Sequence, residues 1–202
     1  MKFSCDKKAL AEAAAGVSRA VVPSSAVPVL QGILLKADGF KLALTGYDLE
    51  MAITTSVEVD VQEPGEIVLP AKLFNDMLRS LAADTVSIES NSELYTKIQS
   101  GITEYDLIGM SAADFPELPS PDAERAFEID AAELAGMIEM TRYAVSTDDK
   151  KPAHTGELFS IEPGELTLVA LDGFRLAITR HPIISDSEIS VVVPAKTVGE
   201  VS

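Results

Sequence analysis

The spacing of apolar residues changes several times along the first half of the chain, and each spacing predicts a different element. FSCD predicts a short strand, and its last residue, Asp6, is a preferred helix N-cap. From residue 7 to residue 20 apolar side chains recur every three or four positions, which predicts a helix with one apolar face. The stretch QGILLKADGFKLALTG at 31–46 predicts two strands around Asp38-Gly39, a strong hairpin signal. VEVDV at 57–61 alternates apolar and acidic side chains and predicts one half-exposed strand.

A second amphipathic helix is predicted after Pro70, and three short strands follow it. The apolar side of this helix carries Phe74, Met77, Leu78 and Leu81. We expect the opposite side to be solvated, and it carries Lys72, Asn75 and Arg79. The strands VSIES, ELYTKIQ and ITEYDLIG are separated by Asn-Ser and Ser-Gly turn pairs. The order strand–helix–three strands therefore occurs twice, which predicts an α+β fold with helices on one face of antiparallel sheets.

The landmarks of the first 80 residues return at a constant offset. Asp48 in TGYDLEMA matches Asp172 in ALDGFRLA, and 172 − 48 = 124. The same offset relates Pro70-Ala71-Lys72 to Pro194-Ala195-Lys196, Phe3 to Phe127, Leu10 to Leu134, Pro28 to Pro152 and Gly32 to Gly156. Beyond Asp48 and Asp172 the identities shift by one, since Ala52-Ile53 matches Ala177-Ile178, and we expect the register to slip there. An internal repeat of this kind predicts two copies of one structural unit.

The charge balance restricts how the protein can meet nucleic acid. Its 202 residues include 16 Lys+Arg and 32 Asp+Glu, a net charge of −16. Such a surface repels DNA almost everywhere, so a DNA contact must be local. No apolar run approaches the roughly 18 residues of a membrane span, and the charged N-terminus has no signal-peptide core. We expect a cytoplasmic protein with no membrane partner.

No pattern of catalytic or cofactor-binding residues is present. The chain lacks the phosphate-binding, dinucleotide-binding, zinc-protease and serine-hydrolase motifs. His154 and His181 have no cysteine or carboxylate at ligand spacing, and Cys5 is the only cysteine, which excludes an internal disulfide and a cysteine-based metal cage. The Asp148-Asp149 pair is typical of a solvated loop. We therefore predict a protein that is not an enzyme and needs no cofactor.

Several stretches, taken in chain order, resemble one known family. They are MKF at 1–3, PVLQGILL at 28–35, LTGYDLEM at 44–51, PAKLFNDMLRSL at 70–81, SAADFPELP at 111–119, KKPAHTGELF at 150–159, ALDGFRLA at 170–177 and VVVPAK at 191–196. Together they resemble the bacterial DNA polymerase III beta subunit, the sliding clamp, over the whole chain. Each stretch alone is a weak signal, and the combination is specific.

The resemblance implies a particular division of the chain. Clamps of this family contain three repeats per chain, and two chains close head to tail into a homodimer ring around duplex DNA. Repeat one then covers residues 1–122, since the three prolines of DFPELPSPD suit a linker. A short linker at 123–126 and an incomplete repeat two at 127–202 follow, and a third repeat is absent. The family's dimer seam maps onto the strand that holds Tyr105 and Leu107, and we expect this chain to leave that sheet edge open.

The resemblance also implies DNA-binding residues. Helices line the ring's hole, so the inward-facing candidates are Lys72, Arg79 and Lys196. The family's second DNA contact lies on loops and maps here onto Ser24, Ser25, Lys150 and Lys151. Lys151 stands where the family often has Arg, so the charge is kept without the bidentate fork. The alternative is that the helix charges belong to an ordinary solvated face.

A partner-docking pocket is the last implication. In the family, the corner of repeat two accepts a short linear peptide from the polymerase, the clamp loader, and other polymerases and repair factors. Carried over to this sequence, the pocket comprises His154, Leu171, Gly173, Phe174, Arg175 and Leu176. Three of these depart from the family's usual residues, since Thr is common at 171, His or Tyr at 174 and an aliphatic residue at 154. The alternative is that Phe174 and Arg175 only pack a hairpin.

The sequence thus favours a non-catalytic, ring-forming clamp that tethers DNA polymerase to duplex DNA. The runner-up is an acidic interaction module that binds clamp partners without encircling DNA, and an enzyme is a distant third.

Overall fold

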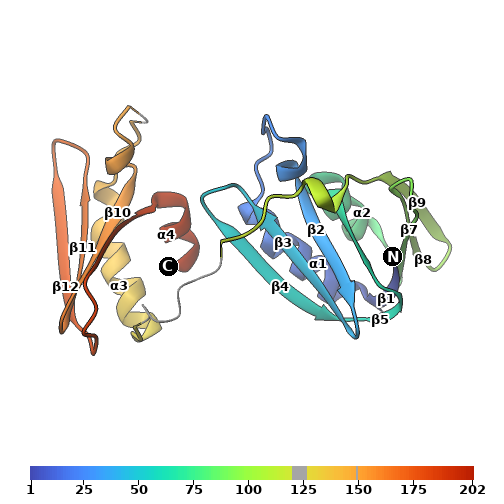
Figure 1. Ribbon diagram of the computed structural model, residues 1–202, viewed down its shortest axis with the longest axis horizontal. Helices are drawn as coiled ribbons and strands as arrows, with labels where there is room; N and C mark the ends of the chain where they lie inside the picture. The colour runs from blue at the N-terminus through green and yellow to red at the C-terminus, as the bar shows by residue number, and fades with distance from the viewer. Residues whose placement is uncertain (120–126, 149) are drawn as a thin grey trace. The chain divides into compact units, whose positions relative to one another are not determined.

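The computed structural model describes residues 1–119, 127–148 and 150–202. Contacts divide the chain into two units, Met1–Pro119 and Ser120–Ser202, which are shown in Figure 1 and described separately below. The linker expected at 123–126 and the predicted loop residue Asp149 lie outside the described residues.

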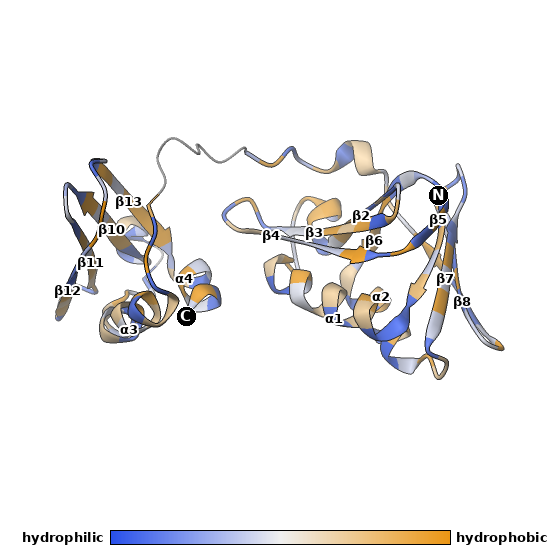
Figure 2. Ribbon diagram, turned by 90° about the horizontal axis from the view of Figure 1, so that it is seen from below, coloured by the Kyte–Doolittle hydropathy of each residue, from blue (hydrophilic) through white to orange (hydrophobic). Residues whose placement is uncertain are grey.

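Unit 1 consists of two antiparallel sheets and two helices. Its elements are β1 (Lys2–Asp6), α1 (Lys7–Val17), β2 (Gly32–Asp38), β3 (Lys41–Tyr47), β4 (Ala52–Glu58), β5 (Asp60–Glu63), β6 (Gly65–Pro70), α2 (Ala71–Ser80), β7 (Thr85–Ser90), β8 (Tyr95–Ser100) and β9 (Thr103–Ile108), with short 3-10 helices η1 (Ser18–Ala20), η2 (Pro28–Gln31) and η3 (Ala112–Asp114). One sheet has the order β5-β1-β7-β8-β9 and the other the order β4-β3-β2-β6. Figure 2 shows α1 and α2 together on one side of the second sheet. The predicted α+β architecture is confirmed.

Local signals in the sequence place the first elements as expected. The Asp6 carboxylate accepts a 2.7 Å hydrogen bond from the Ala9 backbone N–H and begins α1. The helix ends at Val17, three residues earlier than predicted, because η1 tightens the last turn. β2 and β3 form the hairpin around Asp38-Gly39, where Gly39 has a φ of 58°.

The predicted single strand at 57–61 is wrong. Its residues are divided between β4, which pairs with β3, and β5, which pairs with β1 in the other sheet. Val59 lies between the two strands, 7% exposed, and its N–H donates to the Phe40 carbonyl at 3.0 Å. Alternation along the chain is the same on both sides of such a bend, so the pattern could not reveal that the strand changes sheet.

The solvated position predicted for Asn75 is also wrong. Asn75 is 6% exposed and lies where α1 and α2 meet. Its amide donates to the Ser18 hydroxyl and to the Ala71 carbonyl, both at 2.8 Å. A polar residue can be buried when its hydrogen bonds are satisfied, so helical periodicity alone placed it on the wrong side.

The core of unit 1 lies between both sheets and both helices. Its largest fully buried side chains include Phe3 from β1, Leu10 from α1 and Phe74 from α2. Cys5 is buried in β1, and burial raises the pKa of its thiol to about 12, so the thiol stays protonated and packs as a small apolar group.

Unit 2 repeats part of this plan. Its described elements are α3 (Ala131–Thr141), η5 (Arg142–Ala144), η6 (Pro152–His154), β10 (Gly156–Glu162), β11 (Glu165–Leu171), β12 (Leu176–Pro182), β13 (Ile189–Pro194) and α4 (Ala195–Val201). The sheet order β12-β11-β10-β13 matches β4-β3-β2-β6 of unit 1. Asp130 caps α3 as Asp6 caps α1, through the Ala132 and Glu133 backbone N–H groups. The two units therefore share the same helix–sheet construction.

The expected one-residue slip in the repeat is wrong. Tyr47 pairs with Ala52 at the end of the β3–β4 hairpin, and Leu171 pairs with Leu176 at the end of the β11–β12 hairpin. Both pairs keep the offset of 124, since both loops contain four residues. The Ala-Ile identity suggested a slip, whereas backbone pairing fixes the register.

One carboxyl group is buried in the core of unit 2. Glu157 on β10 is 0% exposed, and burial raises the pKa of its carboxyl, against the opposing effects of the Thr141 hydroxyl and the nearby Arg142 charge. The Thr141 hydroxyl lies 2.9 Å from one Glu157 oxygen and 3.0 and 3.3 Å from the Met137 and Ile138 carbonyls. A single hydroxyl proton cannot serve three acceptors. The Thr141 hydroxyl can donate to the Glu157 carboxylate; when Glu157 is protonated, it can instead donate to Thr141 while Thr141 donates to a helix carbonyl.

Candidate docking corner and DNA-facing residues

The four-residue loop between β11 and β12 is organised by one aspartate. The Asp172 Oδ1 atom accepts hydrogen bonds from the Phe174 and Arg175 backbone N–H groups at 2.9 and 3.0 Å. The Asp172 N–H donates to the Arg175 carbonyl at 3.3 Å. Gly173 adopts a φ of 93°, a conformation that favours glycine. The loop is thus an Asx turn with a left-handed second residue.

Arg175 is held on two sides. Its Nε donates to the Asp172 Oδ2 atom at 2.8 Å, and its guanidinium carbon lies 5.7 Å from the centre of the Tyr143 ring. The two backbone N–H groups of the loop, followed by the Arg175 side chain, hold the pKa of the Asp172 carboxyl below its usual value. The Asp172 carboxylate, which organises the turn, therefore stays ionised to a lower pH than a free aspartate does.

The corner presents apolar side chains to solvent. Phe174 is 101% exposed and Leu176 is 59% exposed, while Leu171, paired with Leu176, is partly buried. A fully exposed phenyl ring does not contribute to packing of the hairpin. The arrangement of an apolar surface beside an anchored cation can receive an apolar residue whose neighbouring groups accept hydrogen bonds.

Lys151, from the loop before β10, lies near this corner. The Lys151 Nζ atom is 4.0 Å from the position that a Cβ on Gly173 would occupy. His154 closes η6, and its backbone N–H donates to the Lys151 carbonyl at 2.9 Å. Its Nδ1 atom is buried and has no hydrogen-bond partner among the described residues. The structure thus brings Lys151, expected to contact DNA, beside the docking corner.

Unit 1 contains the same corner in a closed form. The Asp48 Oδ1 atom accepts from the Glu50 and Met51 backbone N–H groups at 3.0 and 2.6 Å. Leu49 stands where unit 2 has Gly173, and it has a φ of 76°. Met51, at the position of Arg175, is 6% exposed. Unit 1 therefore keeps the turn and buries the side chain that unit 2 exposes.

The residues expected to contact DNA are solvent-facing in both units. Lys72 on α2 and Lys196 on α4 are exposed and hold equivalent places, the second position of each helix. Arg79 is exposed and forms an ion pair with Asp76 at 3.5 Å. Of the loop residues, Ser24, Lys150 and Lys151 are exposed and Ser25 is partly buried, with its hydroxyl accepting from the Val27 N–H at 3.1 Å. None of these positions conflicts with a phosphate contact.

The predicted seam strand is β9, which forms one edge of its sheet. Tyr105 is partly buried, and its hydroxyl lies 2.9 Å from the Ser80 hydroxyl. Leu107 is only 5% exposed and belongs to the core, so its side chain is not available to a second chain. The exposed apolar side chains near this edge include Ile108 of β9 and its cross-strand partner Tyr95 of β8, at 62% and 53%. Tyr105 and Leu107 are two residues apart and share the inward face of β9, whereas Ile108 lies on the outward face.

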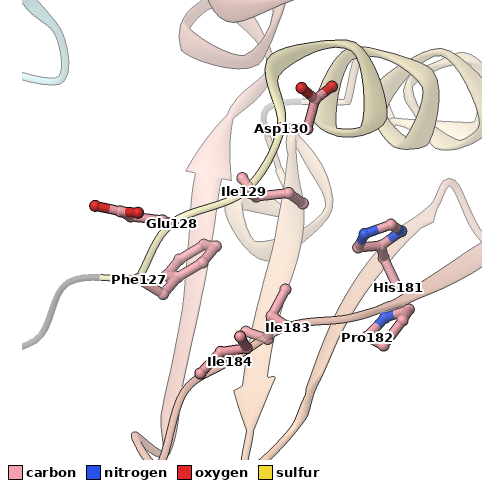
Figure 3. Close-up of a pocket in the computed structure, with 8 residues that line it drawn as sticks. All are labelled: Phe127, Glu128, Ile129, Asp130, His181, Pro182, Ile183 and Ile184. Atoms are coloured by element: carbon pink, nitrogen blue, oxygen red, sulfur yellow. The ribbon is translucent and has the colours of Figure 1, made fainter.

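A groove of about 740 Å³ in unit 2 lies away from the corner. Figure 3 shows its apolar lining, Phe127, Ile129 and Ile183, with His181 close by. His181 Nδ1 lies 3.6 Å from a Glu133 carboxylate oxygen, a contact that sequence spacing did not predict. At the offset of 124, Phe127–Asp130 corresponds to Phe3–Asp6, where unit 1 has β1 paired on both sides. Residues 127–130, which line the groove, thus correspond to residues 3–6, which belong to β1 in unit 1.

Sequence reasoning missed two residues of the corner. Asp172 was used only as a landmark of the repeat, although an aspartate before Gly at a hairpin end signals an Asx turn. Tyr143 carries no sequence signal, because its contact with Arg175 exists only when η5 packs against β11.

Among the described residues, no group of three or more His, Cys, Asp or Glu side chains is placed to bind a metal. In the same part of the chain, no helix is long and apolar enough to cross a membrane.

Comparison with known proteins gives consistent matches along the chain. Residues 1–119 match the model for the N-terminal domain of the DNA polymerase III beta subunit, and residues 128–202 match the model for its central domain. The beta sliding clamp of Bacillus subtilis is 33% identical, over 100% of this chain and 56% of its own length. That of Synechococcus elongatus is 36% identical, over 97% of this chain and 54% of its own length. The chain thus spans about half the length of these relatives.

Solved structures give the same result. The crystal structure of the Bacillus subtilis clamp matches with a TM-score of 0.95 at 32% identity, covering 100% of this chain and 56% of that one. A Pseudomonas aeruginosa sliding clamp bound to griselimycin matches with a TM-score of 0.89 at 31% identity, covering 100% of this chain and 55% of that one. The fold inferred from the residues is therefore the fold of solved clamps.

Proposed function

Since the chain belongs to the DNA polymerase III beta subunit family, we propose that it supplies two units of a sliding clamp that encircles duplex DNA. In this role the protein acts in the cytoplasm, has no catalysis of its own and keeps the replicative polymerase on its template. The observation that carries the proposal is the match of residues 1–119 to the N-terminal clamp domain and of residues 128–202 to the central clamp domain.

The exposed cations support the DNA part of the proposal. Lys72 and Lys196 occupy equivalent helix positions in the two units, and both are exposed. A ring holds DNA by topology, so a few local phosphate contacts suffice despite a net charge of −16. Arg79 and the loop residues Ser24, Ser25, Lys150 and Lys151 complete the proposed DNA-facing set.

The corner around Arg175 supports a docking role in the same protein. We assign to it a short peptide of the polymerase, of the clamp loader, or of other polymerases and repair factors, which places an apolar anchor against Leu171, Phe174 and Leu176. His154, Gly173 and Arg175 complete this pocket. Since one relative is bound to griselimycin, a titration with griselimycin tests whether this chain binds it and whether Arg175→Ala weakens that binding.

We further propose that the longest natural form of the protein assembles as a homodimer ring, with the β9 edge at the seam through Tyr105 and the backbone beside Leu107. The second candidate function, an acidic module that binds clamp partners without encircling DNA, is favoured only by the net charge of −16.

Retention on DNA separates the two candidates. The longest natural form of the protein is loaded by its clamp loader onto nicked circular DNA and washed at high salt. A clamp remains on the circle and is lost once the circle is cut, because only topology resists salt. Equal loss from circular and linear DNA would favour the interaction module.

A further inference from the structure

An aromatic side chain from outside the corner loop contributes to the corner. Tyr143 belongs to η5, directly after α3, and its ring lies 5.7 Å from the Arg175 guanidinium carbon. The tyrosine is 57% exposed, so the ring is not part of the core of unit 2. The ring thus lies at the surface beside a cation of the proposed docking site.

The backbone of Tyr143 is fixed to the hairpin that carries the corner. The next residue, Ala144, is 0% exposed and clusters with Ala170 of β11 and Ala177 of β12. Three small side chains at this place let η5 approach the sheet closely. The packing of Ala144 therefore fixes the backbone of Tyr143 beside the hairpin that carries Arg175.

Arg175 gains a defined orientation from this arrangement. Its Nε is engaged by the Asp172 carboxylate at 2.8 Å, and its planar head lies beside the Tyr143 ring. Even so, 57% of the Arg175 side chain is exposed. Carboxylate and ring together restrict a long flexible side chain before any ligand arrives, which lowers the entropic cost of binding.

Unit 1 offers an internal comparison. At the offset of 124, Tyr143 corresponds to Arg19 and Arg175 corresponds to the buried Met51. Neither member of the cation–aromatic pair is present there. The pair thus occurs in the unit whose corner is open and is missing in the unit whose corner is closed.

We propose that Tyr143 is a positioning residue for partner docking: its ring orients the Arg175 guanidinium toward a peptide that carries an apolar anchor next to carboxylate or main-chain carbonyl acceptors. This inference rests on the docking function proposed above. Tyr143 acts through Arg175, so its effect on affinity depends on the arginine.

A double-mutant cycle tests the dependence. The variants are Tyr143→Phe, Tyr143→Leu, Arg175→Ala and Tyr143→Leu combined with Arg175→Ala, each in the longest natural form of the protein. The probe is a synthetic peptide from the C-terminal tail of the polymerase III catalytic subunit, measured by calorimetry. We expect Tyr143→Leu to weaken binding about two- to fivefold and Tyr143→Phe to change it by less than about twofold, because the ring face is retained. In the Arg175→Ala background Tyr143→Leu changes nothing further.

A second measurement reads the contact without a ligand. In the 202-residue chain, the Nε–Hε resonance of Arg175 is expected to carry a ring-current shift that Tyr143→Leu removes and Tyr143→Phe keeps. Melting curves confirm that each variant is folded.

The outcomes distinguish the two proposals. If Arg175→Ala weakens the peptide and Tyr143→Leu does not, the positioning role is overturned and the docking function stands. A loss on Tyr143→Leu that is equally large without Arg175 overturns the positioning role in favour of a direct contact. If Arg175→Ala leaves affinity unchanged, the docking assignment of the corner fails and the positioning role fails with it.

Discussion

Replacing the buried Glu157 with glutamine should stabilise unit 2 at neutral pH. A glutamine has the size of a protonated glutamate, and its amide can donate to the Thr141 hydroxyl, which lies 2.9 Å from the carboxyl oxygen. The Thr141 proton is then available for the Met137 carbonyl at 3.0 Å. Glu157→Gln therefore keeps the network of the neutral acid and removes the possibility of a buried negative charge.

The sign of the pH effect follows from proton binding. Burial raises the folded pKa of Glu157 above its unfolded value, so the native state binds more protons than the unfolded chain between the two values. The unfolding free energy then falls as pH rises through that window, which begins near the unfolded value of about 4.3. Inside the window the slope stays below the one-proton limit of about 1.4 kcal/mol per pH unit, and it returns to zero above the folded pKa. In Glu157→Gln this contribution is absent.

The expected gain at neutral pH is on the order of 1 kcal/mol, because the amide avoids a buried negative charge but still leaves one polar atom at the unpartnered Oε1 position. For a unit of this size that corresponds to a rise in Tm of about 4–8 °C per kcal/mol. Thermal and urea unfolding, followed at pH values from about 4.5 to 8.5, measure the difference between the two chains. The control is Glu162→Gln, an exposed position at the end of the same strand.

The reasoning would be refuted by parallel stability curves. If wild type and Glu157→Gln change equally with pH, the carboxyl of Glu157 does not hold a proton in the folded state. If Glu162→Gln gives the same gain as Glu157→Gln, the effect comes from net charge and not from burial.

Three other predictions follow from the corners and loops. Arg175→Ala should weaken a polymerase-tail peptide by about 1–2 kcal/mol in calorimetry, whereas Glu50→Ala in the closed corner of unit 1 should not. Equal affinity of the wild-type and Arg175→Ala proteins, both folded, would overturn the docking assignment of the corner. Lys150→Ala with Lys151→Ala should weaken binding to open duplex DNA and flatten its salt dependence, with no change in sequence preference, in anisotropy titrations; an unchanged salt slope would return both lysines to a solvated loop. Leu49→Gly should raise the unfolding free energy of unit 1 by up to about 1 kcal/mol in urea titrations. The reason is that a leucine at a φ of 76° is strained, and this strain exceeds the conformational entropy that glycine adds to the unfolded chain. A loss of stability would show that the leucine side chain makes contacts that stabilise unit 1 by more than the strain costs.

Local signals were enough for most of the secondary structure. A capping residue, a helical period or a turn pair acts within a few residues, so Asp6, Asp38-Gly39 and Pro70 each mark an element that the structure contains. The internal repeat added long-range information, because a feature of one copy can be compared with the position 124 residues away in the other copy. It identified the open corner at 172–176, and the matches to clamp domains agree with the family that the motifs suggested.

Tertiary structure decided what each side chain meets. Periodicity could not show that Val59 separates two sheets, that Asn75 is buried between helices, or that Glu157 sits at 0% exposure beneath Thr141. It gave no sign that Tyr143 would lie beside Arg175. Such contacts join residues distant in sequence, and their energies depend on burial and hydrogen-bond geometry that exist only after the sheets and helices have packed.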